Sequence, residues 1–197
     1  MAGVITLKES RLDEEYVYKG EITNEVIRKW AYDENMLLLE QDEDLVAGDR
    51  EFFPALFEAA EDPECPKGGY AISIMDFYLM FQILKGDDSS IPIVEEAIEY
   101  CEKSNDKEIK AWKAILEKRI LYKKGIGEVD KATALEMGQI LLNGICRSSD
   151  ISIADETCDE WVVELSVPPF HRHKERIYID KTTGKFKSKV SNGGKWL

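Results

Sequence analysis

Two histidines that lie two residues apart, His171 and His173, are the first side chains in this sequence that could hold a metal ion. On a strand this spacing points both imidazoles to one side, where Glu175 or Asp180 could complete a ligand set. The pair is surrounded by three bases, Arg172, Lys174 and Arg176. Positive neighbours disfavour a bound cation. An exposed loop is therefore the favoured interpretation, and we expect no metal and no cofactor.

Asp76 is the most unusual acid, because it lies within the segment 70–84, where twelve of fifteen residues are apolar. An ionised carboxylate in such a segment is costly unless it has a partner. Asp76 could therefore be a functional acid. The favoured interpretation is structural: Asp76 either shares a polar helix edge with Ser73 or pairs with a base on a neighbouring helix.

The four cysteines, Cys65, Cys101, Cys146 and Cys158, are spaced 36, 45 and 12 residues apart. Zinc sites need closer ligand pairs, so this spacing argues against one. Cys101 and Cys146 lie among apolar residues at helical spacing, which is typical of core side chains. Reduced thiols, and an N-terminus without a signal-peptide pattern, favour a cytoplasmic protein. The glycine patterns of phosphate sites and of the nucleophile elbow do not occur in the sequence.

Acidic residues dominate the first third of the chain. The formal net charge is −13, and residues 1–66 hold 18 acids against 6 bases, whereas residues 131–197 hold 9 against 10. A solvated face explains many such clusters. A dense acidic surface near aromatic residues also fits a basic protein partner. We expect the partner-binding residues to be centred on the segment 40–51 and to be Trp30, Asp33, Glu34, Glu40, Asp42, Glu43, Asp44, Asp49 and Glu51.

The same charge disfavours two other classes of partner. Nucleic acid and anionic membranes attract positive protein surfaces, so we expect neither to bind. No apolar run in the sequence is long enough to span a bilayer. The oligomeric state stays open at this point.

The elements that must position these residues are mainly helices. Apolar residues at helical spacing predict helices near 26–38, 50–60, 70–84, 92–103, 107–124 and 131–143. The expected N-caps are Thr23 or Asn24, Asp49, Asn105 or Asp106, and Asp130. Glycines or polar turns follow most of these segments. Residues 1–126 are therefore predicted to be an acidic, bundle-like helical region.

The last third has a different pattern. Residues 161–167 alternate between apolar and polar, which predicts a strand that is buried on one face. Residues 176–180 and 185–190 are predicted to form a hairpin around Gly184, and three lysines on the last strand are typical of an edge. The expected fold class is α+β, mainly α. Residues 127–197 would form a helix and a small antiparallel sheet that packs on the first region.

Three segments of this last third resemble a family of bacterial immunity proteins with a nuclear-transport-factor-like, or cystatin-like, fold. The matching residues are Lys131-Ala132-Thr133-Ala134-Leu135-Glu136, Trp161-Val162-Val163 and Ile179-Asp180-Lys181-Thr182-Thr183-Gly184-Lys185. The resemblance covers about 60 residues. It implies a protein without enzymatic activity that binds a cognate toxin and blocks its active site.

The expected function is therefore neutralisation of a bacterial toxin, such as a nuclease with a basic active-site cleft. An acidic inhibitor suits a basic cleft, because opposite charges steer the two proteins together. Two alternatives remain at this stage. One is a small metal- or carboxylate-dependent enzyme that uses Asp76 or the two histidines. The other is a non-catalytic regulatory module with a tail similar to a peptidase propeptide.

Overall fold

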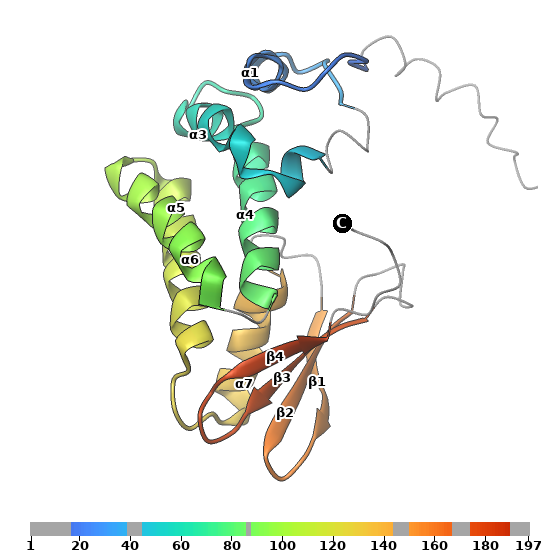
Figure 1. The fold of residues 1–197 in the computed structure, drawn as a ribbon, viewed down its shortest axis with the longest axis vertical. Helices are drawn as coiled ribbons and strands as arrows, with labels where there is room; N and C mark the ends of the chain where they lie inside the picture. Colours follow the sequence, from blue (N-terminus) through green and yellow to red (C-terminus); the bar gives the residue numbers. More distant parts are fainter. Residues whose placement is uncertain (1–16, 39–44, 86–87, 144–149, 167–173, 190–197) are drawn as a thin grey trace, which may run out of the picture. The chain divides into compact units, whose positions relative to one another are not determined.

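The computed structural model describes residues 17–38, 45–85, 88–143, 150–166 and 174–189 (Figure 1). Its helices and small antiparallel sheet confirm the predicted α+β class with mainly helical structure. The chain divides into two compact units, unit 1 at Met1–Tyr78 and unit 2 at Leu79–Leu197. The predicted regions 1–126 and 127–197 mark a change in secondary structure, and as domains they stay a prediction.

Helix α1 (Asn24–Tyr32) begins at Thr23, whose side chain accepts a hydrogen bond from the amide of Val26. The predicted N-cap is confirmed, but the predicted helix is too long. It ends at Tyr32, and Met36 and Leu38 are buried in the non-helical segment that follows. Leu37 forms a parallel bridge with Val17 there. Apolar residues that continued the helical spacing are therefore buried by an extended segment instead.

Asp49 caps the next helical segment, as the sequence predicts, by accepting a hydrogen bond from the amide of Glu51. A short 3-10 turn (η3, Arg50–Phe52) leads into α3 (Phe53–Glu61), which has a proline at its start, where proline is tolerated. Helix α4 (Gly68–Leu84) starts in unit 1 and ends in unit 2. Four of its side chains, at spacings of four, are fully buried: Ala71, Met75, Leu79 and Ile83.

Unit 2 continues with a 3-10 turn (η4, Asp88–Ser90) and two further helices, α5 (Ile91–Lys103) and α6 (Lys107–Lys124). Asp106 caps α6 by accepting hydrogen bonds from two amides, and Gly125 closes the helix with a positive φ of 90°. Asp130 caps α7 (Lys131–Gly138), whose last turn passes into a π-helical segment at Gln139–Asn143 (η5). These caps confirm the helix starts predicted from the sequence.

The sheet of unit 2 has the strand order β1-β2-β3-β4, with antiparallel neighbours throughout. Its strands are β1 (Asp150–Glu156), β2 (Glu160–Ser166), β3 (Lys174–Asp180) and β4 (Phe186–Lys189). Strand β1 was not predicted from the sequence. Strand β4 lies at an edge of the sheet, as predicted.

Strand β2 differs from the prediction in its burial. Val162 and Glu164 are buried, although they alternate with the buried residues Val163 and Leu165. The expectation of one solvated face is therefore wrong. Glu164 is only 6% exposed, and its carboxylate pairs with Arg176 on the neighbouring strand β3, at 2.6 Å to Nη2.

Helix α7 packs against one face of this sheet (Figure 1). Its last residue is Gly138, and a Cβ at this position would collide with Val163 and lie 3.0 Å from Cγ2 of Ile151. Only glycine allows the helix to approach β1 and β2 this closely. The missing side chain thus sets the distance between helix and sheet.

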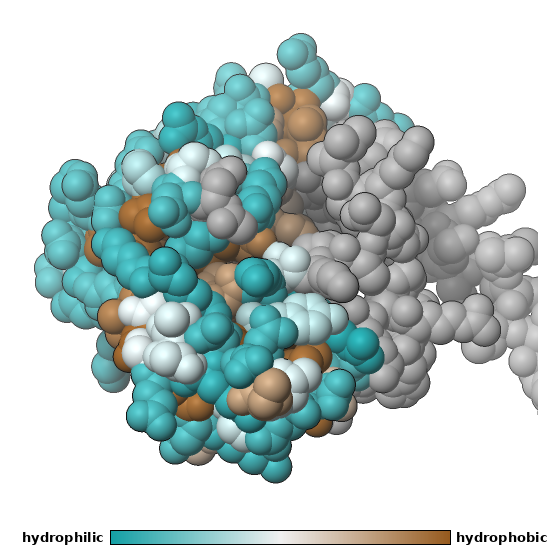
Figure 2. Space-filling model, turned by 60° about the horizontal axis from the view of Figure 1, so that its bottom comes forward, coloured by the Kyte–Doolittle hydropathy of each residue, from teal (hydrophilic) through white to brown (hydrophobic). Residues whose placement is uncertain are grey.

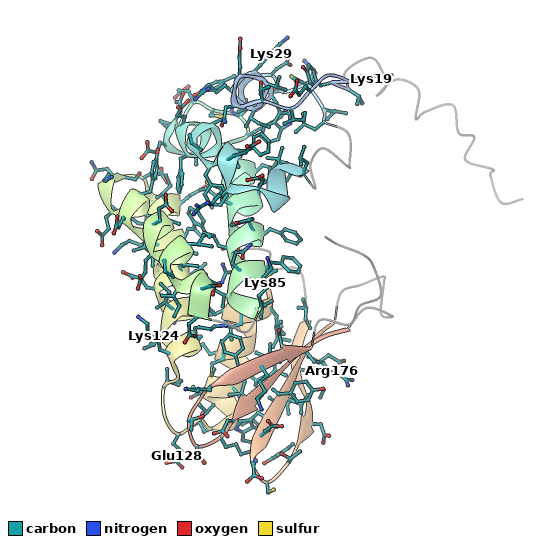
Figure 3. The ribbon with its side chains drawn as sticks, in the orientation of Figure 1. Lys19, Lys29, Lys85, Lys124, Glu128 and Arg176 are labelled. Carbon is teal, nitrogen blue, oxygen red and sulfur yellow. The ribbon has the colours of Figure 1, made fainter. Side chains whose placement is uncertain are left out.

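Three loops join at one end of the sheet. The amide of Gly127 in the α6–α7 loop donates to the carbonyl of Thr183, and the amide of Val129 donates to that of Lys181. The backbone amide of Lys181 donates in turn to the carbonyl of Asp159 in the β1–β2 turn. We call these three connections, residues 125–130, 157–159 and 180–185, the loop cluster. Glu128 marks its outer side (Figure 3).

Candidate functional site

Helices α1 and α3 run parallel, so both end at the same side of unit 1. Near their beginnings, the side-chain amide of Asn24 donates to the carbonyl of Glu51 at 3.0 Å. At their ends, the hydroxyl of Tyr32 donates to the carboxylate of Asp62 at 2.7 Å. The two contacts join residues 27 and 30 positions apart in sequence. This packing brings acids from two separate segments together.

A bidentate ion pair joins the two helices between these contacts. Nη2 of Arg28 lies 2.9 Å from Oε1 of Glu58, and Nε bonds to the other carboxylate oxygen. The guanidinium lowers the pKa of Glu58, and the carboxylate raises the pKa of Arg28. Both side chains are about half exposed, so the pair adds little to stability. It fixes the orientation of one acid and neutralises it.

Tyr32 is an exposed aromatic residue held in place by its hydroxyl. The hydrogen bond to Asp62 raises the pKa of Tyr32 to about 12. The same bond, together with the amide of Glu64, lowers the pKa of Asp62. Tyr32 is therefore neutral at physiological pH and Asp62 is ionised. The residue as a whole is 50% exposed.

Five acids lie where α1 and α3 end, and we call them the acidic end: Asp33, Glu34, Glu61, Asp62 and Glu64. Helix C-termini carry partial negative charge, and bases usually compensate it. Helix α3 has no base in its last turn. Helix α1 has Lys29 in its last turn, whereas α3 ends with acids alone, so at the end of α3 the helix dipole and the carboxylates act in the same direction.

The structure corrects the prediction for Trp30. The side chain is only 2% exposed, so it cannot contact a partner. Its ring centroid lies 5.7 Å from that of Tyr70, and Nζ of Lys67 lies 4.9 Å from the Trp30 ring. Trp30 therefore belongs to the core of unit 1. Tyr32, two residues later, is the exposed aromatic side chain of this surface.

The other described residues of the prediction fall into two groups along α1. Asp33 and Glu34 are exposed and lie at the end of α1. Asp49 and Glu51 are also exposed, but they lie near the beginning of α1, because Glu51 is bonded to Asn24. The nine residues of α1 separate the two groups by about 13 Å. The remaining predicted acids, Glu40, Asp42, Glu43 and Asp44, lie outside the described residues.

Three acids that sequence reasoning missed belong to the acidic end: Glu61, Asp62 and Glu64. They were not predicted because they lie far from α1 in the sequence. A signal was present in the spacing, since Arg28 and Tyr32 lie four residues apart on one helix face, as do Glu58 and Asp62 on the other. Matching these two faces required the knowledge that the helices run parallel.

The other candidate residues were those that could support an enzyme. Asp76 is 4% exposed, so it lies inside the helical packing and not on a solvated edge. Cys101 is buried as predicted, and Cys65 is buried as well. Cys158 is exposed, and its hydrogen bond to Asp159 raises the pKa of its thiol. His171, His173 and Cys146 lie outside the described residues.

Two features are absent from the described residues 17–38, 45–85, 88–143, 150–166 and 174–189. Among those residues, no group of three or more His, Cys, Asp or Glu side chains could hold a metal ion. Within the same ranges, no helix has both the length and the apolar character needed to cross a bilayer.

The acidic end and Tyr32 are therefore the best candidate site. On the face shown in Figure 2, hydrophobic residues form separate patches among hydrophilic ones. Comparison of the chain with protein-family models, with curated proteins and with solved structures found no match.

Proposed function

We propose that this chain is an immunity-type protein that binds a cognate bacterial toxin through the acidic end of unit 1. The toxin would carry a basic active-site cleft, such as that of a nuclease, and the bound protein would block it. The observation that carries the proposal is the convergence of two helix C-termini and five carboxylates beside an exposed tyrosine.

The distribution of charge supports this choice of surface. Residues 1–78 hold 19 acids and 7 bases, a balance of −12, whereas residues 79–197 hold 20 and 19, a balance of −1. Almost the whole net charge of the chain thus belongs to unit 1. Such a field raises the rate of encounter with a basic partner and lowers it for an acidic one.

Tyr32 supplies apolar contact area, which charged side chains alone do not provide. Aromatic residues contribute buried area at the centre of many protein interfaces, and tyrosine is enriched there. Its ring can also stack on a guanidinium or an ammonium group of the partner. The surface therefore combines long-range steering with an aromatic side chain for the centre of the interface.

The test needs a defined partner, namely the toxin domain encoded next to this chain. Binding is measured by isothermal titration calorimetry at low and high salt, and inhibition by the toxin's own activity. The double variant Glu34→Lys/Glu64→Lys reverses two exposed acids of the acidic end. We expect its Kd to rise about tenfold or more at low salt and to depend less on salt.

A matched control makes the same change of charge in unit 2. Glu99→Lys/Glu108→Lys reverses two exposed acids on α5 and α6. We expect this variant to bind almost as the original protein does. Equal losses in both double variants would refute the proposed surface, and a neighbouring protein that neither binds nor is inhibited would refute the proposed function.

A further inference from the structure

Lys67 is the base at the acidic end whose ammonium group contacts the end of α1. Nζ donates to the carbonyl oxygens of Trp30 at 2.9 Å, of Asp33 at 2.7 Å and of Met36 at 2.7 Å. An ammonium carries three N–H donors, so the three acceptors match its capacity. It also lies 4.9 Å from the ring of Trp30.

One of these three carbonyls lies at the end of α1, and the other two lie in the non-helical turn that follows. Trp30 lies in the last turn of α1, where carbonyls lack helical partners, and Asp33 and Met36 belong to the turn that follows. Within that turn, the amide of Met36 donates to the carbonyl of Asp33 at 3.1 Å. The amide of Asn35 donates to the Asp33 carboxylate, also at 3.1 Å. The ammonium thus closes a turn of which Asp33 and Glu34 are part.

We propose that Lys67 is a positioning residue of the acidic end: its ammonium holds the turn 33–36 so that Asp33 and Glu34 face a basic partner. This inference rests on the proposed function, because it assigns a role within that surface. Charge-assisted hydrogen bonds are about twice as strong as neutral ones, so three of them suffice to order a short turn.

The sign of the change in affinity for a basic probe separates this positioning role of Lys67 from a simple effect of its charge. A lysine beside a surface that attracts cations opposes binding through its charge. Its removal would therefore strengthen the binding of a basic probe if charge were its only contribution. A positioning role predicts the opposite, since a disordered turn presents its acids less effectively and must be ordered again on binding.

The probe is a fluorescein-labelled decalysine peptide, and its binding to the full chain is followed by fluorescence anisotropy at low salt. Lys67→Met removes the ammonium, and Lys67→Arg keeps a charged donor. The matched control is Lys29→Met, because Lys29 is an exposed lysine on α1 and its loss changes the net charge by the same amount (Figure 3). We expect Lys29→Met to bind about twofold tighter and Lys67→Met about fivefold weaker.

Hydrogen exchange supplies a second readout, which does not depend on the probe. We expect the amides of Asn35 and Met36 to exchange at least about tenfold faster in Lys67→Met and unchanged in Lys29→Met. Lys67→Arg should restore part of both effects. If Lys67→Met unfolds unit 1, Lys67→Gln, which keeps two N–H donors, replaces it in both measurements.

The outcomes separate this inference from the proposed function. Tighter binding by Lys67→Met, or unchanged exchange at Asn35 and Met36, would overturn the positioning role and leave the acidic surface in place. If Glu34→Lys/Glu64→Lys also left decalysine binding unchanged, the acidic end would not be the cation-binding surface. In that case the proposed function would fail together with this inference.

Discussion

Substitution of Gly138 by alanine tests whether close contact sets the distance between α7 and the sheet. The new Cβ would collide with Cγ1 of Val163 and lie 3.0 Å from Cγ2 of Ile151. Val163 is fully buried in β2, a central strand of the sheet, so it has little room to move. Overpacking of this kind costs about 1–3 kcal/mol. Alanine regains up to about 1 kcal/mol, because it favours a helix more than glycine does.

We therefore expect Gly138→Ala to lower the free energy of unfolding by about 1–2 kcal/mol. For a chain of this size, each kcal/mol corresponds to a Tm shift of about 2–4 °C. The assay is urea unfolding followed by circular dichroism, with hydrogen exchange of the β2 amides as a local probe. The control is Gly48→Ala, where a Cβ would meet no atom within 4 Å and where we expect no loss.

A double-mutant cycle locates the cause. If the collision with Val163 produces the loss, Gly138→Ala should cost less in a Val163→Ala background than in the original chain. A Gly138→Ala protein that is at least as stable as the original would refute the reasoning. So would a cycle without coupling, because the cost would then come from the backbone and not from the contact.

Three further predictions concern unit 2. Gly184→Ala should destabilise the hairpin by about 1–2 kcal/mol in urea unfolding, because φ is 65° and a Cβ would lie 2.8 Å from Cγ1 of Ile126. Arg176→Met should lower the free energy of unfolding by about 1–3 kcal/mol, measured by thermal unfolding, because the buried Glu164 loses its guanidinium partner. The double variant Arg176→Met/Glu164→Met should lose less stability than this single variant. The third prediction concerns stability at acidic pH. Hydrogen bonds from Thr183, its amide first, lower the pKa of Asp180 in the folded state. The unfolded chain then binds more protons, so the contribution of Asp180 to stability is present above about pH 4 and is lost as the pH falls further. Asp180→Asn should flatten this part of the pH profile of Tm.

The helix starts could be predicted because their signals are local. Thr23, Asp49, Asp106 and Asp130 each cap a helix through side-chain bonds to amides two or three residues away. Such contacts depend only on the neighbouring sequence. The Gly184 turn was predictable for the same reason, since positive φ is a property of one residue.

Features that depend on distant partners could not be predicted. The end of α1 was misplaced because the segment after it pairs with Val17, and no local pattern encodes that bridge. Strand β1 was missed because it is an edge strand that carries acids and has a register shift between Ile153 and Asp155. What defines β1 as a strand is its antiparallel pairing with β2, which lies outside its own sequence.

The candidate site also combines features that local sequence predicts with features that depend on distant partners. The excess of acids in unit 1 and the exposure of Asp33 and Glu34 followed from composition and local pattern. The convergence of Asp62 with Tyr32 depends on the parallel packing of two helices, which is a tertiary property. The burial of Trp30 was unpredictable for the same reason, because it depends on contacts with Lys67 and Tyr70.

The loop cluster of unit 2 changes what its turns can tolerate. Exposed hairpin turns are normally the places where a chain accepts insertions or proteolytic nicks, because they open without disturbing the rest of the structure. Here the turn 180–185 shares backbone hydrogen bonds with residues 127 and 129, and with Asp159. None of the three connections can open without breaking bonds to another. They therefore form one cooperative unfolding unit, and an insertion in any of them would loosen the start of α7 as well.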